Sequence, residues 1–132
     1  MNAYSKPLPV ISEASRPFWE ALRRQELRLP QCDACGRYRA YFERWCAHCG
    51  SERFTWAQAS GRGTVWSHCY FHKVYLKGFE AEVPYNVSLV KLAEGPLLIT
   101  NIPGARPSIG TPVAAVFDAV TADITLLKFR PA

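Results

Sequence analysis

The distribution of hydrophobic and polar residues divides the chain into three parts. Residues 1–29 begin with an arm that contains prolines and continue with helical periodicity. Residues 30–58 follow no regular period and carry four of the five cysteines. Residues 59–132 consist of short apolar or alternating runs separated by Gly and Pro, which is typical of strands. The pattern therefore predicts an N-terminal arm and helix, a small cysteine-rich module and a β domain.

A single helix is predicted after the arm. Ser12 or Ser15 is suited to the N-cap position, and Pro17 then falls in the first turn, where proline is tolerated. One face of the helix is formed by residues at i, i+4 and i+7 spacing: Phe18, Leu22 and Gln25. Trp19 adds a large apolar surface beside this face. We expect the face to pack on the rest of the chain; the alternative is that it docks onto a partner protein.

Five strands are predicted in the C-terminal part: residues 64–73, 85–92, 97–102, 113–120 and 124–129. A shorter alternating segment, Leu27 to Leu29, leads into the cysteine-rich module. Five short strands with Gly and Pro at their turns are typical of a small closed or nearly closed barrel, and the five-stranded OB-fold fits best. The predicted fold class is mostly β with an N-terminal helix, in which the OB-fold barrel follows the cysteine-rich module.

The cysteines of the central module form two C-x-x-C pairs that are separated by ten residues, each pair followed by Gly. A C-x-x-C turn presents two thiolates about one edge of a tetrahedral metal site apart. The four predicted metal ligands are Cys32, Cys35, Cys46 and Cys49. They complete a rubredoxin-like zinc ribbon with no open coordination position, so the predicted role of the Zn²⁺ is structural. Iron in the same site and a pair of disulfides are the alternatives, and His48 is interpreted as a loop residue.

Composition and charge narrow the class of protein. With 48% hydrophobic and 20% charged residues, the chain is typical of a globular protein. The formal charge of +5 falls to about +3 once four thiolates and Zn²⁺ contribute −2. Residues 1–60 carry nine basic and six acidic residues, and residues 61–132 carry seven and five, so neither half is a basic arm. A dedicated nucleic-acid binder is therefore disfavoured.

The same sequence predicts a location in the cell. No charged n-region followed by an apolar stretch opens the chain, and no apolar run approaches membrane-spanning length. In a reducing compartment, C-x-x-C pairs hold metal more often than they form disulfides. We therefore expect a cytoplasmic protein without a membrane segment.

The strand predicted over residues 64–73 carries the side chains best suited to binding. Strict alternation places one set in the barrel interior: Val65, Ser67, Cys69 and Phe71. The opposite face carries Trp66, His68, Tyr70 and His72. Aromatic rings stack on bases and imidazoles donate to phosphates, so this face suits a ligand or a partner. A face that is simply covered by the ribbon or by the helix fits the pattern equally well.

Three cations and one cysteine complete the set of candidates. Lys73, Lys77 and Arg106 add positive charge around this face, although an exposed Lys is usually solvated surface. Cys69 is interpreted as a small core residue on the face opposite the two histidines. A nucleophilic cysteine needs a lowered pKa and a neighbouring base, so this placement argues against a Cys–His pair.

Several segments resemble a known family. Phe18 to Leu22, Leu27 to Leu29 and the two cysteine motifs are similar to its N-terminal helix and zinc ribbon. Further similarity lies in three segments: Ser60 to Val65, Val83-Pro84-Tyr85 and Lys128 to Pro131. The family combines a zinc ribbon with an OB-fold and was catalogued as domain of unknown function family thirty-five. The resemblance covers nearly the whole chain, and the combination of these motifs is more specific than the cysteines alone.

The resemblance implies a role beside acyl-CoA chemistry. Members of this family are partners of thiolase-like enzymes. They occur in assemblies that link acetoacetyl-CoA thiolase to hydroxymethylglutaryl-CoA synthase, in acyltransferases, and with steroid side-chain aldolases and hydratases. In these assemblies the OB domain helps to bind CoA or to shape the acyl channel, while the partner supplies the catalytic residues. The resemblance therefore implies CoA or acyl-CoA as a ligand and transfers no catalytic residue to this chain.

We accordingly expect an accessory, acyl-CoA-binding or scaffolding subunit in a hetero-oligomer with a thiolase-superfamily acyltransferase, synthase or aldolase. The chain is not expected to be catalytic alone, because 132 residues are too few for the two-half thiolase architecture. Three alternatives remain open. They are a single-stranded nucleic-acid-binding protein, a small enzyme that uses Cys69 or the histidines His68 and His72, and a scaffold that binds no ligand.

Overall fold

The computed structural model describes residues 4–41, 43–104 and 106–132. The elements of this part are α1 (Arg16–Arg23), β1 (Arg28–Cys32), β2 (Phe54–Gln58), β3 (Arg62–Phe71), β4 (Tyr85–Leu92), β5 (Leu97–Thr100), β6 (Pro112–Ala119) and β7 (Thr125–Pro131). β1 and β2 form an antiparallel ribbon, and the other strands form one antiparallel sheet in the order β5-β4-β3-β6-β7. The predicted fold class is confirmed: a helix and a cysteine-rich ribbon precede a five-stranded OB-like sheet.

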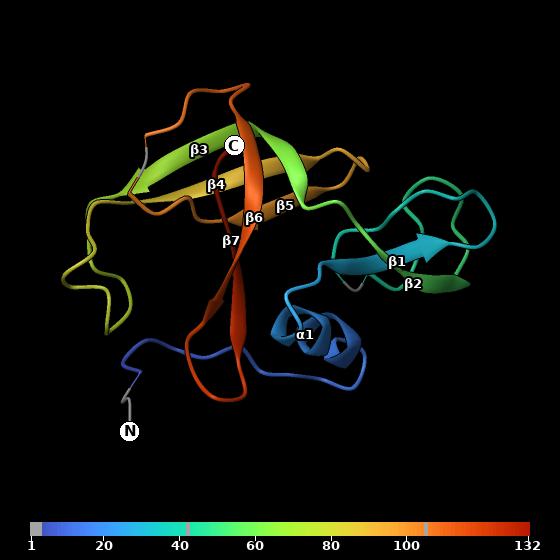
Figure 1. Cartoon of the computed structure of the whole chain (residues 1–132), viewed down its shortest axis with the longest axis horizontal. Coiled ribbons are helices and arrows are strands. Elements are labelled where there is room, and N and C mark those ends of the chain that lie inside the picture. The colour runs from blue at the N-terminus through green and yellow to red at the C-terminus, as the bar shows by residue number, and fades with distance from the viewer. Residues whose placement is uncertain (1–3, 42, 105) are drawn as a thin grey trace.

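The five-stranded sheet curls so that its two edge strands approach each other (Figure 1). The Thr100 hydroxyl at the end of β5 donates a hydrogen bond to the Leu127 carbonyl of β7, at 3.1 Å. The backbone N–H of Phe129 donates to the Asn101 carbonyl, also at 3.1 Å. These bonds occupy backbone groups that an open edge would leave to another chain. The sheet is thus a nearly closed barrel.

One hydrophobic core joins the helix, the ribbon and the barrel. Its members from the N-terminal half are Phe18 and Leu22 of α1 with Leu27 and Leu29 beside and within β1. Its members from the barrel are Val65, Val90, Leu92, Leu98, Ile102, Val113 and Phe129, with Ala59 at the junction. Side chains that share a contiguous core hold their elements in one arrangement. The interpretation that the helix packs on its own chain is therefore confirmed.

The helix begins where one of the two predicted caps lies. Ser15 occupies the N-cap position and Pro17 lies in the first turn. The Ser15 side chain does not cap the helix; its hydroxyl lies 3.0 Å from that of Ser12, which ties the arm to the helix start. Gln25 does not belong to the buried face, because it follows the helix end with a φ of 60°. Ala21 takes part in the buried face instead.

The alternation predicted for β3 is wrong beyond Val65. In the pairing of β3 with β4, Val65 lies opposite Val90 and Ser67 lies opposite Leu89, so Trp66 is an extra residue in a β-bulge. One inserted residue moves every later side chain to the other face of the sheet. Cys69 is consequently exposed and not in the barrel interior.

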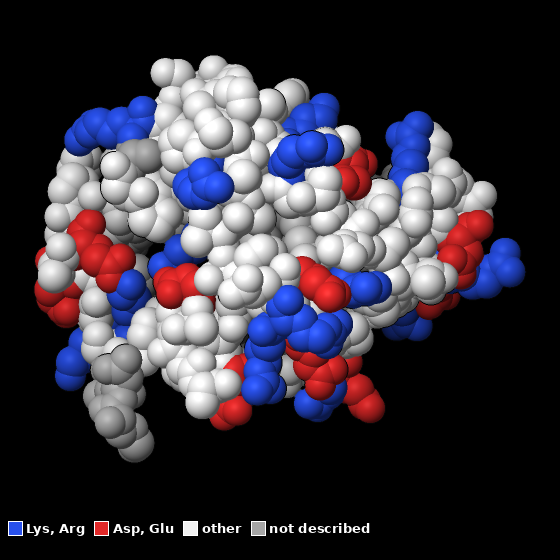
Figure 2. Space-filling model, in the orientation of Figure 1, with Lys and Arg blue, Asp and Glu red and all other residues white. Residues whose placement is uncertain are grey.

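The surface shows no concentration of one charge on the face drawn in Figure 2. Lys and Arg side chains alternate there with Asp and Glu over broad uncharged areas. In the described part of the chain, no helix has the length and apolar character needed to cross a bilayer.

Candidate functional site

The ribbon brings the four predicted metal ligands together. Their sulfur atoms all lie within 4.8 Å of one another. The Sγ atoms of Cys32 and Cys49 are 3.5 Å apart, and so are those of Cys35 and Cys46. Around a Zn²⁺ with Zn–S bonds of about 2.3 Å, the edge of a regular tetrahedron measures about 3.8 Å. The four thiols are therefore positioned to hold one metal ion.

Each pair of ligands lies on a tight turn that ends at a glycine. The Gly36 N–H donates to the Cys32 carbonyl at 2.9 Å, and the Gly50 N–H donates to the Cys46 carbonyl at 2.8 Å. Gly36 and Gly50 have φ values of 80° and 78°, in the left-handed region that glycine adopts without a steric cost. The glycine after each C-x-x-C pair is thus a geometric requirement of the site.

The thiols of the site have unequal proton affinities. The backbone N–H groups of Cys35 and Ala34 lower the pKa of the Cys32 thiol to about 6. The Arg37 N–H acts to lower the pKa of Cys35, but desolvation by the surrounding turn and the neighbouring sulfurs outweigh it and raise that pKa to about 11. Four crowded sulfurs do not ionise together without a counter-charge. A divalent cation supplies that charge, and a site of four thiolates fits Zn²⁺.

A buried arginine supports the ribbon and was missed by the sequence analysis. Arg39 is 2% exposed, and its guanidinium donates to the carbonyls of Arg44 at 2.9 Å, Ser51 at 2.8 Å and Arg53 at 3.1 Å. It also lies over the Phe54 ring, 5.0 Å from the centroid. Arg39 therefore links the loop of the second cysteine pair to β2. Nothing in the sequence distinguishes it from the exposed arginines around it.

The predicted binding face of β3 is divided by the bulge. Trp66 is 51% exposed and lies beneath the Lys91 ammonium, 4.8 Å from its ring centroid. His68 and Tyr70 are half-buried and remain together, their rings in an edge-to-face contact at 5.6 Å. The structure thus separates Trp66 from the other two.

All but one of the remaining predicted residues line two different hollows. Arg106 lies over the Tyr70 ring at 5.0 Å, and both line a cavity of about 390 Å³, named here the polar cavity. His72 and Lys73 line a separate surface hollow, which Tyr70 also borders. Lys77 lines neither of them. The predicted residues therefore do not form one surface. Tyr70 and Arg106 are the pair that lines the polar cavity.

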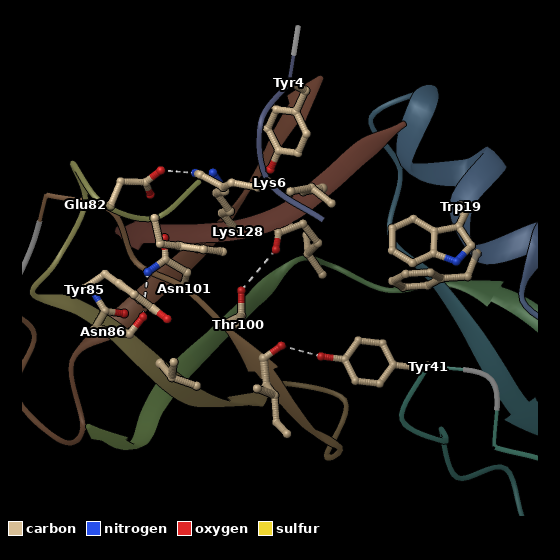
Figure 3. A pocket seen from close by; sticks show the side chains of 16 residues that line it. Tyr4, Lys6, Trp19, Tyr41, Glu82, Tyr85, Asn86, Thr100, Asn101 and Lys128 are labelled. Atoms are coloured by element: carbon tan, nitrogen blue, oxygen red, sulfur yellow. Dashed lines mark hydrogen bonds and ion pairs between the residues drawn. The ribbon is translucent and has the colours of Figure 1, made fainter. Parts of the chain in front are cut away.

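The structure also has an apolar pocket of about 520 Å³ (Figure 3). None of the residues that were predicted to bind a ligand lines it. It lies between the N-terminal arm, α1 and the strands β4, β5 and β7. Trp19 and Tyr41 stand at one end, and Tyr85 and Asn101 stand at the other, with Lys6 above them. These residues are scattered along the whole chain, so no local sequence signal could have revealed the pocket.

Comparison with known proteins identifies the family. Residues 19–55 match the model of the ChsH2 rubredoxin-like zinc ribbon domain, and residues 56–118 match that of the ChsH2 C-terminal OB-fold domain. A DUF35 domain-containing scaffold protein of Methanocaldococcus jannaschii is 31% identical over 111 residues, which cover 76% of this chain and 78% of that protein. The chain belongs to the DUF35 family. The predicted family resemblance is confirmed.

Two further relatives are similar over nearly the whole chain. A solved structure described as an Ltp2-ChsH2(DUF35) aldolase contains a chain with 34% identity and a TM-score of 0.80, and the match covers 94% of this chain and 98% of that one. A probable enoyl-CoA hydratase alpha subunit of Thermomonospora curvata is 35% identical over 130 residues. The match covers 96% of this chain and 40% of the hydratase subunit, so this chain spans less than half of that relative.

Proposed function

We propose that this DUF35 chain is an accessory subunit that assembles with an acyl-CoA-processing enzyme of the thiolase superfamily and contributes part of the acyl-CoA binding site. The observation that carries the proposal is the similarity to the DUF35 chain of the Ltp2-ChsH2(DUF35) aldolase, with a TM-score of 0.80 over 98% of that chain. The names of two other relatives, a scaffold protein and an enoyl-CoA hydratase subunit, point the same way.

The architecture supports a rigid platform more than an enzyme. A metal-ligand cluster of four cysteines holds the ribbon, and a common core joins the ribbon to the barrel. In the described part of the chain, Cys69 is exposed and forms no hydrogen bond to His68 of β3 or to His72, which follows the strand. A nucleophilic cysteine requires such a base within hydrogen-bond reach. The proposal therefore assigns catalysis to the partner and binding to this chain.

The test is a pull-down with the tagged, zinc-loaded chain from its native cell extract. We expect one partner in stoichiometric amount, identified by mass spectrometry as an acyl-CoA enzyme, which then elutes together with the chain in gel filtration. Its turnover should rise when the purified chain is added to the isolated enzyme. Val10→Trp is the control variant, because Val10 lies in the arm and is 92% exposed. We expect this variant to recover the same partner in the same amount.

Two outcomes would contradict the proposal. A co-eluting partner whose turnover is the same with and without the chain would reduce the chain to a scaffold. Recovery of nucleic acid alone, with affinity that falls steeply as salt is added, would instead favour the single-strand-binding alternative, since phosphate contacts are salt-dependent.

A further inference from the structure

The apolar pocket has the size and walls of a small-molecule site. Its volume of about 520 Å³ lies within the range of about 300–1,000 Å³ that is typical of ligand pockets. Phe18, Trp19 and Tyr41 form an aromatic group at the end near α1, with Phe18 in edge-to-face contact with the other two at 5.1 and 5.5 Å. Val87 and Leu127 add aliphatic walls from the barrel. This end suits a bulky apolar group.

The charged groups of the pocket are already paired, so the pocket is not suited to a free carboxylate. Lys6 forms an ion pair with Glu82, and Lys128 forms one with Asp118 at 2.7 Å. Burial raises the pKa of Tyr41 to about 12, so its hydroxyl stays neutral and donates to the Ile99 carbonyl. Burying an unpaired charge against such walls is costly. The occupant of the apolar end is therefore an uncharged group.

The polar side chains at the opposite end form hydrogen bonds within the protein. The Asn86 amide donates to the Ile102 carbonyl at 2.7 Å, and the Asn101 amide donates to the Asn86 carbonyl at 2.7 Å. These bonds fix the wall between β4 and the segment after β5. This end is thus polar and held by hydrogen bonds, while the end near Trp19 is mainly aromatic, with the buried Trp19 Nε1 as a polar atom that has no hydrogen-bond partner in the described part of the chain.

The polar cavity adjoins the apolar pocket at this end. The two volumes share four lining residues: Glu82, Tyr85, Asn86 and Asn101. Beyond them, the polar cavity reaches Tyr70 and the guanidinium of Arg106, which lies over the Tyr70 ring. Glu82, the carboxylate common to both, is neutralised by Lys6. A ligand that extends from one volume into the other would meet an apolar end, a neutral polar middle and a cation.

We propose that the two volumes form one site for a bulky acyl thioester of a phosphate-bearing carrier, with the acyl group against the Trp19 and Tyr41 rings and the carrier arm leaving past Tyr85 toward Arg106. This inference rests on the proposed acyl-CoA function, and it names the part of the chain that holds each part of the ligand. An acetyl group would leave most of the apolar pocket empty, so the site selects for large acyl groups.

Calorimetric titration of the full zinc-loaded chain, without a partner, tests the site with three probes: CoA, acetyl-CoA and phenylacetyl-CoA. We expect phenylacetyl-CoA to bind about tenfold more tightly than CoA, because its ring is buried against aromatic walls. Acetyl-CoA should differ little from CoA. The difference in affinity between the probes measures the contribution of the acyl group, since the carrier is the same in all three.

Variants then assign the two halves of the site. Leu127→Trp and Val87→Phe fill the apolar pocket from different strands, and each should weaken phenylacetyl-CoA about tenfold while CoA is unchanged. Arg106→Gln should weaken all three probes by the same factor, about fivefold, because it removes a cation from the carrier's path. Val10→Trp adds a ring outside both volumes and should change nothing. Zinc content and thermal unfolding verify that each variant is folded.

The inference is overturned if no probe binds the zinc-loaded chain, if phenylacetyl-CoA binds no more tightly than CoA, or if folded Leu127→Trp and Val87→Phe bind it as the parent does. An Arg106→Gln variant with unchanged affinity for all probes would overturn the carrier path. These results are independent of the pull-down. If the pull-down recovers an acyl-CoA enzyme but the chain binds no probe, the site is contradicted and the subunit role is not. If the chain binds the probes but the pull-down recovers no acyl-CoA enzyme, the subunit role is contradicted and the site is not.

Discussion

The ribbon and the barrel of this DUF35 chain reach a fixed structure by different means. In the ribbon, Cys32 and Cys46 are the buried cysteines, Cys35 and Cys49 are exposed, and the sulfur cluster lies between short turns. In the barrel, side chains such as Leu98 and Phe129 are fully buried and strands far apart in sequence pair. A metal site of this kind derives its folding energy from coordination, whereas a barrel derives it from apolar burial. The two regions should therefore respond to different perturbations.

Removal of a metal ligand should have the largest effect. We expect Cys32→Ser to lose the ion and to unfold the ribbon, because metal-binding energy is folding energy in such modules and amounts to about 10 kcal/mol or more. Metal analysis and circular dichroism measure the two effects. Cys69→Ser is the matched control, since Cys69 lies outside the cluster. A Cys32→Ser protein with full zinc content would refute the four-cysteine assignment.

Truncation of the barrel core should be the next largest effect. Phe129→Ala should lower the free energy of unfolding by about 3–5 kcal/mol, because the ring is fully buried and leaves a cavity. Urea unfolding measures the loss. Zinc content should stay at one ion per folded chain, which separates this variant from the ligand variants. Phe79→Ala, at a partly buried ring on the wall of the apolar pocket, is the control and should cost less.

The arginine of the ribbon should give an intermediate effect. Arg39→Met removes the charge-assisted hydrogen bonds to four loop carbonyls and should cost about 2–3 kcal/mol. The Ser51 and Arg53 carbonyls keep a bond from the Cys46 and Asp33 N–H groups, so the carbonyl that depends most on Arg39 is that of Arg44. The rate of zinc transfer to a chelator should also rise, since the loop of the second cysteine pair is no longer anchored. Arg37→Met, at an exposed position, should change neither quantity. Equal behaviour of the two variants would show that Arg39 is not a support of the ribbon.

The smallest effect concerns the exposed cysteine of β3. Cys69→Ala should change the free energy of unfolding by less than about 0.5 kcal/mol, because the side chain is not in the core. In the zinc-loaded protein, Cys69 should also react at once with a thiol reagent, while the coordinated cysteines react slowly. Slow reaction of all five thiols would contradict the placement of Cys69 outside the barrel.

Prediction from the sequence succeeded where a local pattern carries the information. The turns that hold the cysteines are short, and their glycines need only a left-handed φ, so residue spacing is sufficient to predict that the four cysteines form one cluster. The strands of the barrel were located for the same reason, and the bounds of β4 were predicted without error. The helix was located by its apolar period, although Gln25 lies beyond its end.

Prediction failed where one segment depends on a distant one. The bulge at Trp66 arises from the register of β3 against β4, and it moved Cys69 to the surface. Arg39 is buried because backbone carbonyls from the second cysteine loop and from the residues before β2 surround it. The residues next to Trp66 and Arg39 in the sequence carry no pattern that indicates a bulge or a buried arginine.

The sequence by itself determined the zinc ribbon, the number and order of the main strands and the DUF35 family, because each depends on residue spacing along a short stretch of chain. Only the tertiary structure decided which side chains face a common volume. The apolar pocket combines the arm, α1 and strands as distant as β4 and β7, and its junction with the polar cavity depends on how β4 meets the segment after β5. Such contacts are fixed by strand register and closure of the barrel, which local periodicity does not encode.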